Sequence, residues 1–151
     1  MRLRARSRLA VGAPALYAWH IAPGAFLNLL PPWETLRLVG ADQGISPGCL
    51  RQLKVTPLRV PWWAYHDQFV QDRQFRDVQQ RGPCRRWEHS HRFEPETEEH
   101  CILTDEVDFE LPLEPLSRLV YPLLRAQFQT MFLNRIKQRM RELPVSISVC
   151  L

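Results

Sequence analysis

The chain has 151 residues and a net charge of +4, with 45% hydrophobic and 24% charged residues. This size fits a single domain, residues 1–151, that can bury a core, and the composition is that of an ordinary globular protein. No apolar run is long enough to span a bilayer, and the mild positive charge comes without a clustered basic patch or nucleic-acid-binding motif. We therefore expect neither membrane insertion nor a nucleic-acid partner.

The N-terminus and the cysteines both indicate a cytoplasmic protein. The positive residues after Met1 are not followed by an apolar core of signal-peptide length. The cysteines have no paired spacing and no zinc motif, which predicts reduced thiols; they are Cys49, Cys84, Cys101 and Cys150. No glycine-rich nucleotide loop occurs, and we expect no cofactor.

The first half of the chain is predicted to contain one strand, two short helices and then further strands. Residues 2–9 alternate arginine with apolar or small residues, the pattern of a half-buried strand. Short helices are expected over 13–19 and 23–30, with apolar anchors at Leu16, Trp19, Phe26, Leu27 and Leu30. The next strands are expected at 34–39, 49–58 and 61–70, separated by segments rich in Gly, Asp and Pro.

The second half is predicted to form a hairpin, a long strand and a long helix. Strands are expected at 74–80, 84–93 and 99–111, and the tail 145–151 is either irregular or a short edge strand. The helix should cover 121–143 after a helical turn that starts at Pro115. Apolar residues there recur at steps of three and four, which predicts one buried stripe: Leu116, Leu119, Val120, Leu123, Leu124, Phe128, Met131, Phe132, Ile136, Met140 and Leu143.

A long one-sided helix that follows a run of strands favours a curved sheet with the helix in its concave face. If the first strand lies beside 99–111, its arginine row (Arg2, Arg4, Arg6 and Arg8) faces Glu106, Asp108 and Glu110. Each cross-strand pair of opposite charges would then stabilise the sheet by roughly 0.2–1 kcal/mol. We favour this interpretation of the row over a docking face for an acidic partner.

The order of these elements and several local motifs resemble a known family. The motifs are Ala18-Trp19-His20-x-x-Pro23-Gly24-Ala25-Phe26, Pro31-Pro32-Trp33, Phe75-x-Asp77-x-Gln79-x-x-Gly82-Pro83, Trp87-x-His89-x-His91-x-Phe93, Thr104-Asp105, Leu111-Pro112, and Met131-Phe132 with Arg135. Together they resemble a bacterial, cyclase/dehydrase-like branch of the SRPBCC (START-like, helix-grip) superfamily.

The resemblance implies an α+β helix-grip fold: a curved seven-stranded antiparallel sheet wrapped on a long C-terminal helix, with two short helices after the first strand. It also implies a pocket for an apolar ligand, but it does not bring an established reaction. The branch is sometimes fused to a nucleotide-sugar-epimerase-like domain, which we do not expect in this chain. Cys84 stands where the family often has Phe, and the family's Tyr-Arg-His after the late Phe is replaced here by Leu133-Asn134-Arg135.

Strand alternation predicts a group of titratable side chains inside the fold. The aromatic and aliphatic residues of the strands 74–80, 84–93 and 99–111 must face inward, because they are large and apolar. The same alternation carries five polar residues inward with them: Asp77, Gln79, His89, His91 and Asp105. Buried carboxylates and imidazoles are costly unless they are paired, so we expect them to contact one another.

This group has three possible interpretations. It is a structural network that fixes the register of the sheet, or the polar end of a ligand pocket, or a chemical site. The pocket would have its polar end at Asp77, Gln79, His89, His91 and Asp105, and its walls at Trp87, Phe93, Leu103, Phe128, Met131 and Phe132. A chemical site would use the histidines with Asp105 as general acid and base, or as metal ligands, but a His-x-His pair with an aspartate is weak metal evidence and no metal is assigned.

The sequence therefore predicts a protein that binds a small, mainly apolar molecule, lipid- or polyketide-like, as a monomer or weak homodimer. A cyclase/dehydratase-type enzyme that uses His89 or His91 with Asp105 is the alternative. A regulatory protein that acts through contacts of its arginine row is a second alternative.

Overall fold

The computed structural model describes residues 1–30, 36–55, 59–113, 115–126, 128–130 and 147–150. The chain begins with β1 (Arg2–Leu9), α1 (Ala13–Ile21) and α2 (Ala25–Leu29). Six strands follow: β2 (Leu36–Leu38), β3 (Leu50–Val55), β4 (Val60–Val70), β5 (Gln74–Arg81), β6 (Arg86–Pro95) and β7 (Cys101–Glu110). A 3-10 helix, η1 (Leu116–Val120), leads into helical residues 121–126 and 128–130, and the last described element is β8 (Ile147–Cys150).

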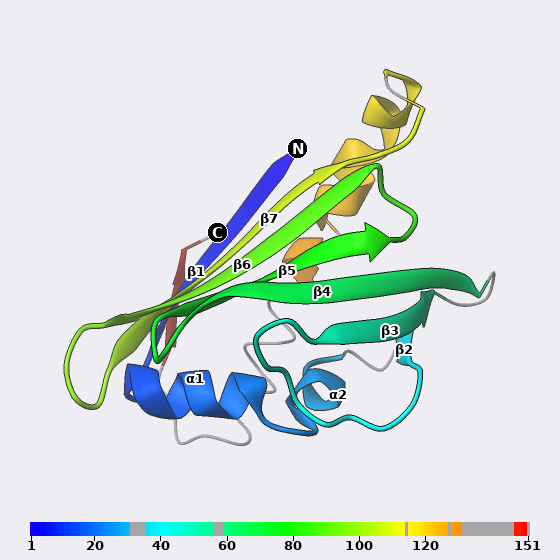
Figure 1. Cartoon of the computed structure of the whole chain (residues 1–151). Helices are drawn as coiled ribbons and strands as arrows, with labels where there is room; N and C mark the ends of the chain where they lie inside the picture. The colour runs from blue at the N-terminus through cyan, green and yellow to red at the C-terminus, as the bar shows by residue number, and fades with distance from the viewer. Residues whose placement is uncertain (31–35, 56–58, 114, 127, 131–146, 151) are drawn as a thin grey trace.

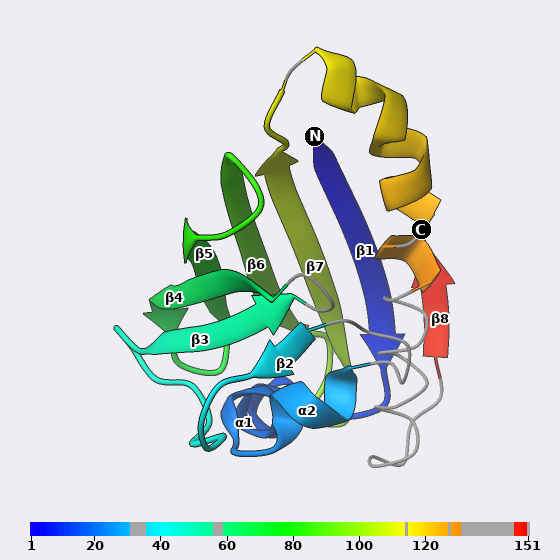
Figure 2. The ribbon, with the colours of Figure 1, turned by 90° about the vertical axis from the view of Figure 1, so that its right-hand side faces the viewer.

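The described strands form one curved antiparallel sheet in the order β2-β3-β4-β5-β6-β7-β1-β8. β1 lies beside β7, so the first and last strands of the predicted seven are neighbours. The sheet bends so that β2 to β4 turn toward the side on which the helices lie, with α1 and α2 at one end (Figures 1 and 2). This is the predicted helix-grip arrangement, and β8 adds an eighth strand at the edge, in the tail for which an edge strand was one of two expectations.

The C-terminal helix is confirmed only over its described part. Phe128 packs its ring against Trp87 and Phe109, with ring centroids 5.4 and 5.6 Å apart. Tyr121 and Leu124 join the same apolar cluster. The beginning of the helix therefore rests on the sheet as predicted, whereas residues 131–143 of the predicted helix, which include Met131 and Phe132, lie outside the described residues.

Two predictions of burial were wrong. Leu116, Leu119, Val120 and Leu123 were expected on the buried stripe, but their exposed fractions are 71%, 83%, 45% and 70%. η1 stands beyond the end of β7 (Figure 2), and its three residues per turn interrupt the 3.6-residue repeat on which the stripe was based. Leu27 was expected as an anchor but is 47% exposed, because the short α2 turns Ala25 and Leu29 inward instead.

The apolar core consists of two clusters at opposite ends of the long strands. The first lies against α1 and contains Leu16 and Tyr17 together with Phe75, Phe93 and Leu103 from the sheet. The second lies against the C-terminal helix and is built from Leu3, Ala5, Trp87, Val107 and Phe109. Along β6, Trp87 belongs to one cluster and Phe93 to the other, so the inward residues between them, His89 and His91, fall between two apolar cores.

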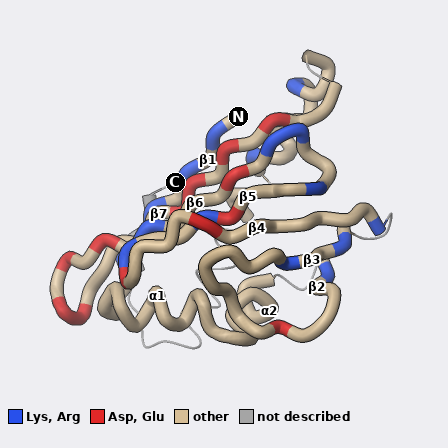
Figure 3. Tube along the Cα trace, viewed as in Figure 1, with Lys and Arg blue, Asp and Glu red and all other residues tan. Residues whose placement is uncertain are grey.

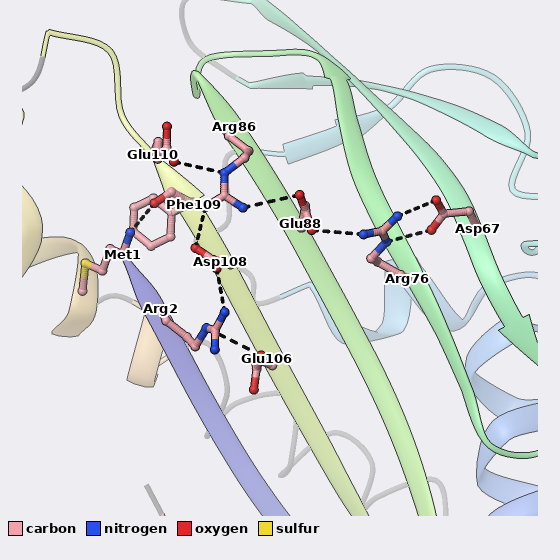
Figure 4. A network of polar contacts seen from close by, with 10 residues as sticks. All are labelled: Met1, Arg2, Asp67, Arg76, Arg86, Glu88, Glu106, Asp108, Phe109 and Glu110. Carbon is pink, nitrogen blue, oxygen red and sulfur yellow. Dashed lines mark hydrogen bonds and ion pairs between the residues drawn. The ribbon is translucent and has the colours of Figure 1, made fainter.

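The outer face of the sheet carries a network of opposite charges (Figures 3 and 4). Arg2 lies 3.0 Å from Asp108 and 3.7 Å from Glu106, and Arg4 lies 4.0 Å from Glu106, as the strand pairing predicts. Glu110 contacts Arg86 instead of the β1 row, because it lies directly across from Arg86 on β6. Arg6 and Arg8 contact Glu94 and Glu96 at the far end of β6. The described partners of the arginine row thus come from its own sheet and from the turn between β6 and β7.

Within this network, substitution of Arg76 should lower the free energy of unfolding the most. Its guanidinium donates to both carboxylate oxygens of Asp67, at 2.9 and 2.7 Å, and to Glu88 at 3.1 Å. Its side chain is only 23% exposed, which limits screening by solvent. We expect Arg76→Gln to lower the free energy of unfolding by about 1 kcal/mol in low salt and by less in high salt. Urea denaturation at two ionic strengths measures both effects.

Arg4→Gln provides the matched control, since Arg4 is 57% exposed and, among the described residues, its one ion pair is 4.0 Å long. This variant should unfold like the wild type at either ionic strength. Equal losses for Arg76→Gln and Arg4→Gln would show that the bidentate pair adds nothing.

Candidate functional site

Strand pairing assembles the polar cluster (Asp77, His89, His91 and Asp105) in two neighbouring rows across the sheet. In one row, Asp77 of β5 lies directly across from His89 of β6. In the next row, His91 of β6 lies directly across from Asp105 of β7. Residues directly opposite in an antiparallel pair have Cβ atoms about 4.5–5.5 Å apart, so the backbone alone brings these side chains within contact distance.

The contacts within the polar cluster alternate between carboxylate and imidazole. His89 Nδ1 lies 3.5 Å from Asp77 Oδ1, and His89 Nε2 lies 3.6 Å from Asp105 Oδ1. His91 Nδ1 lies 2.7 Å from the same Asp105 oxygen. The side chains of His89, His91 and Asp105 are 7%, 8% and 4% exposed, while that of Asp77 is 17% exposed. The predicted mutual pairing of the buried titratable groups is confirmed for these four residues.

The environment of the cluster shifts the pKa values of the two imidazoles in opposite directions. Burial opposes a charged His89, but the carboxylates of Asp77 and Asp105 outweigh burial and raise its pKa. Burial and the neighbouring His89 lower the pKa of His91 to about 4. Burial alone would raise the pKa of Asp77, yet the adjacent imidazoles, His89 foremost, lower it to about 2. The cluster therefore favours an ionised Asp77 and a neutral His91, and it holds a proton on His89 more firmly than water would.

Three members of the cluster line a cavity of about 390 Å³. Asp77, His89 and His91 form part of its wall, and Asp105 lies behind the two histidines. Most of the remaining wall is apolar and comes from α2, from β2 to β7 with their connecting segments, and from the C-terminal helix: Phe26, Leu29, Leu36, Ile45, Leu53, Val55, Trp62, Ala64, Phe75, Pro83, Cys84, Trp87, Phe109, Leu111, Leu124 and Phe128. Burial raises the pKa of Cys84 to about 11, which keeps its thiol neutral within this apolar wall.

Of the predicted walls, Trp87 and Phe128 line the cavity. Phe93 and Leu103 do not line it, because α1 covers their end of the sheet and Tyr17 packs on Phe93 with ring centroids 5.5 Å apart. Gln79 was expected at the polar end, but its side chain closes the β5–β6 hairpin: Nε2 donates to Cys84 O at 2.7 Å and Oε1 accepts from Cys84 N at 3.3 Å.

Three polar residues of the cavity wall were not predicted as site residues: His20, Arg51 and His66. His66 lies across from Asp77 and extends the first row to β4. Alternation along the strand did not predict this inward position, because β4 carries aromatic residues on both faces and its pairing with β5 contains two register shifts. His20 donates from Nδ1 to Leu16 O at 2.7 Å, near the end of α1, and also lines the cavity. Arg51 pairs with Asp42, and no pattern in the sequence indicated its inward position.

Comparison with known proteins shows similarity at the level of structure. No family model matches the sequence, and no curated protein matches it. Norcoclaurine synthase from Thalictrum flavum, solved in complex with dopamine and hydroxybenzaldehyde, is 15% identical with a TM-score of 0.67; the match covers 94% of this chain and 87% of that one. Ara h 8.0201 is 13% identical with a TM-score of 0.59, and the match covers 89% of this chain and 94% of that one.

A nucleoside-diphosphate sugar epimerase from Corynebacterium glutamicum is 23% identical with a TM-score of 0.68. The match covers 90% of this chain but only 28% of the epimerase. These likenesses confirm the predicted helix-grip fold. Among the described helices, none is both long and apolar enough to cross a bilayer.

The opposite pKa shifts of the two histidines predict opposite effects on stability in acid. The unfolded chain protonates His91 near pH 6.5, whereas the folded state resists protonation down to about pH 4. His91 therefore lowers the free energy of unfolding progressively as the pH falls through that range. His89, whose pKa is raised, contributes stability that is fully present below pH 6.5 and is lost as the pH rises through its folded pKa.

Urea denaturation between pH 8 and pH 4, with EDTA present, tests both signs. His91→Gln should make the loss of stability below pH 6.5 shallower than in the wild type, whereas His89→Gln should remove the part of the stability that the wild type gains as the pH falls from 8 toward 6.5. Parallel pH profiles for the two variants would contradict the assigned protonation states.

Proposed function

We propose that this protein binds a small, mainly apolar molecule in the cavity between the sheet, α2 and the C-terminal helix. The observation that carries this proposal is a cavity of about 390 Å³ with a largely apolar wall and one cluster of buried titratable groups. Sites for small molecules typically measure about 300–1,000 Å³ and combine apolar walls with a few fixed polar groups. The molecule would be held mainly by burial of apolar surface, at about 25 cal/mol per Å² before the costs of association.

The apolar and polar residues of the cavity wall would hold different parts of the ligand. Trp87 and Phe128, with ring centroids 5.4 Å apart, offer flat surfaces for a ring, and Leu53 offers an aliphatic surface for a chain. Asp77, His89 and His91 offer hydrogen-bonding groups for a polar head group. The complex of norcoclaurine synthase with dopamine and hydroxybenzaldehyde supports small aromatic molecules, each a ring with a polar substituent, as a first class of ligand to test.

The setting that we propose is the cytoplasm, with the chain acting as a monomer or weak homodimer. Cys49 and Cys84 are free thiols, which suits a reducing compartment. A role as a contact protein that docks through its arginine row is less well supported, because acids of the same sheet and of the turn between β6 and β7 already pair with Arg2, Arg6 and Arg8.

Filling the cavity should weaken ligand binding. Ala64 is 7% exposed and lines the cavity, so Ala64→Phe would place a ring in the space that the ligand occupies. We expect Ala64→Phe to weaken binding of 1-anilinonaphthalene-8-sulfonate by about tenfold or more, equivalent to about 1.4 kcal/mol. Titration followed by probe fluorescence measures this, and Ala64→Leu is the milder variant should the larger ring disturb folding.

Ala18→Phe is the matched control, because Ala18 is exposed on α1 and the substitution is the same. The control should bind the probe like the wild type. Equal affinity in Ala64→Phe and Ala18→Phe would mean that the probe binds elsewhere, and the cavity would lose its assigned role.

A second candidate function is a cyclase or dehydratase acting on a polyketide-like carbonyl compound. The contact that favours it joins Asp105 Oδ1 to His91 Nδ1 at 2.7 Å, with His91 on the cavity wall. A carboxylate behind an imidazole fixes its tautomer and orients it for proton transfer to or from a bound molecule.

Asp105→Asn separates this candidate from simple binding. An enzyme should lose about 100-fold or more in turnover on this substitution while it still binds substrate. A binding protein should turn over none of the carbonyl compounds that it binds, in either form. Turnover that is equal in Asp105→Asn and the wild type would exclude the proposed role of the Asp105–His91 pair.

A further inference from the structure

We propose that Asp77, His89 and His91 form a binding site for a divalent transition-metal cation. Each residue offers one ligand atom, and these atoms lie within 4.8 Å of one another. Two imidazoles and one carboxylate form a donor set that suits zinc or iron. The three side chains are 7–17% exposed, so they do not resemble the solvated acidic groups that gather on surfaces without a ligand.

The spacing between His89 and Asp77 fits a shared cation. Two ligand atoms that each lie about 2.1 Å from a tetrahedral cation are about 3.4 Å from each other. His89 Nδ1 and Asp77 Oδ1 are 3.5 Å apart, which matches that value and exceeds the usual 2.7–3.2 Å of a hydrogen bond. A cation between the two atoms would therefore replace the proton that Asp77 favours on His89 and would require little movement of either side chain.

Asp105 supplies the supporting contact that a histidine ligand normally has. Its Oδ1 lies 2.7 Å from His91 Nδ1, which leaves Nε2 of His91 as the nitrogen for the cation. Histidine ligands commonly donate their other ring nitrogen to a carboxylate, which fixes the tautomer and the ring orientation. Phe75 stacks on the same imidazole, with ring centroids 4.4 Å apart, and restricts its rotation further.

All three ligand residues lie on paired strands, which hold them more firmly than loops would. Asp77 and His89 are directly opposite each other on β5 and β6, and His91 is two residues further along β6 on the same face. Sites built on strands keep their geometry before the ligand arrives, so little ordering cost opposes binding.

The cation would also define the polar head group of the bound molecule, a use that rests on the proposed function. Because Asp77, His89 and His91 line the cavity, a cation with three protein ligands would keep an open coordination position there. That position suits an oxygen donor such as a carboxylate, phenolate or enolate. The cation site itself does not depend on the apolar ligand.

Titration of the chelator-treated full chain with Co²⁺, a spectroscopic substitute for Zn²⁺, tests the site. We expect one equivalent to bind with the visible absorption of a four- or five-coordinate ion, and Zn²⁺ to displace it. Asp105→Asn should weaken binding by about 10–100-fold, the usual effect of removing a partner of a metal ligand. Asp77→Asn and His91→Gln should lose more than that, and His100→Gln, outside the cluster and beside Thr97, should bind like the wild type.

Two results would overturn the proposal: no saturable Co²⁺ binding by the wild type, or equal affinity in Asp77→Asn, His91→Gln and His100→Gln. If the ligand variants do not fold, the stoichiometry and spectrum of the wild type decide the question alone. Probe fluorescence of the metal-free protein is measured in parallel. If the protein binds the probe but not Co²⁺, the metal site is refuted and the proposed ligand binding is retained. If it binds Co²⁺ but not the probe, the proposed ligand binding is refuted and the metal site is retained.

Discussion

The structure depends on how four titratable side chains are accommodated between two apolar cores. Asp77, His89, His91 and Asp105 occupy inward positions at the middle of the long strands, where unpaired charge would cost several kcal/mol per group. Strand pairing gives each of them a partner of the other chemical type. A one-residue slip between β5 and β6 would turn one member of the Asp77–His89 pair to the outer face, so this pairing specifies the sheet register.

The two faces of the sheet use charge in different ways. On the outer face, Arg2, Arg76 and Arg86 alternate with carboxylates in partly exposed contacts, which neutralise one another and contribute modestly. On the inner face the charges are few, deeply buried and adjacent to a cavity. Clusters of perturbed titratable groups beside a cavity are typical of functional sites, although structural networks perturb pKa values as well.

Much of this arrangement follows from local pattern. Strict alternation along β1, β6 and β7 predicted both the arginine row and the inward histidines, because each of these strands pairs on both sides without a bulge. The alternation rule was insufficient for β4, where register shifts and aromatic residues on both faces concealed the orientation of His66. Helical periodicity also gave a wrong prediction of burial at Leu116 and Leu119. Periodicity cannot show that these residues lie beyond the end of the sheet, where nothing described covers them.

The cavity itself was predictable only as a consequence of the fold. Which aromatic residues form its wall depends on how α1 and α2 divide the concave face: α1 covers Phe93, whereas α2 leaves space beside Leu53 and Trp62. The inward position of Arg51 likewise depends on its tertiary pairing with Asp42.

Native mass spectrometry of the protein purified from its own host tests the central claim most directly. We expect a retained small organic molecule that leaves on denaturation and is missing when the cavity is filled at Ala64. The same retained mass in the wild type and in the filled variant would contradict the account, because the molecule would then be bound outside this cavity.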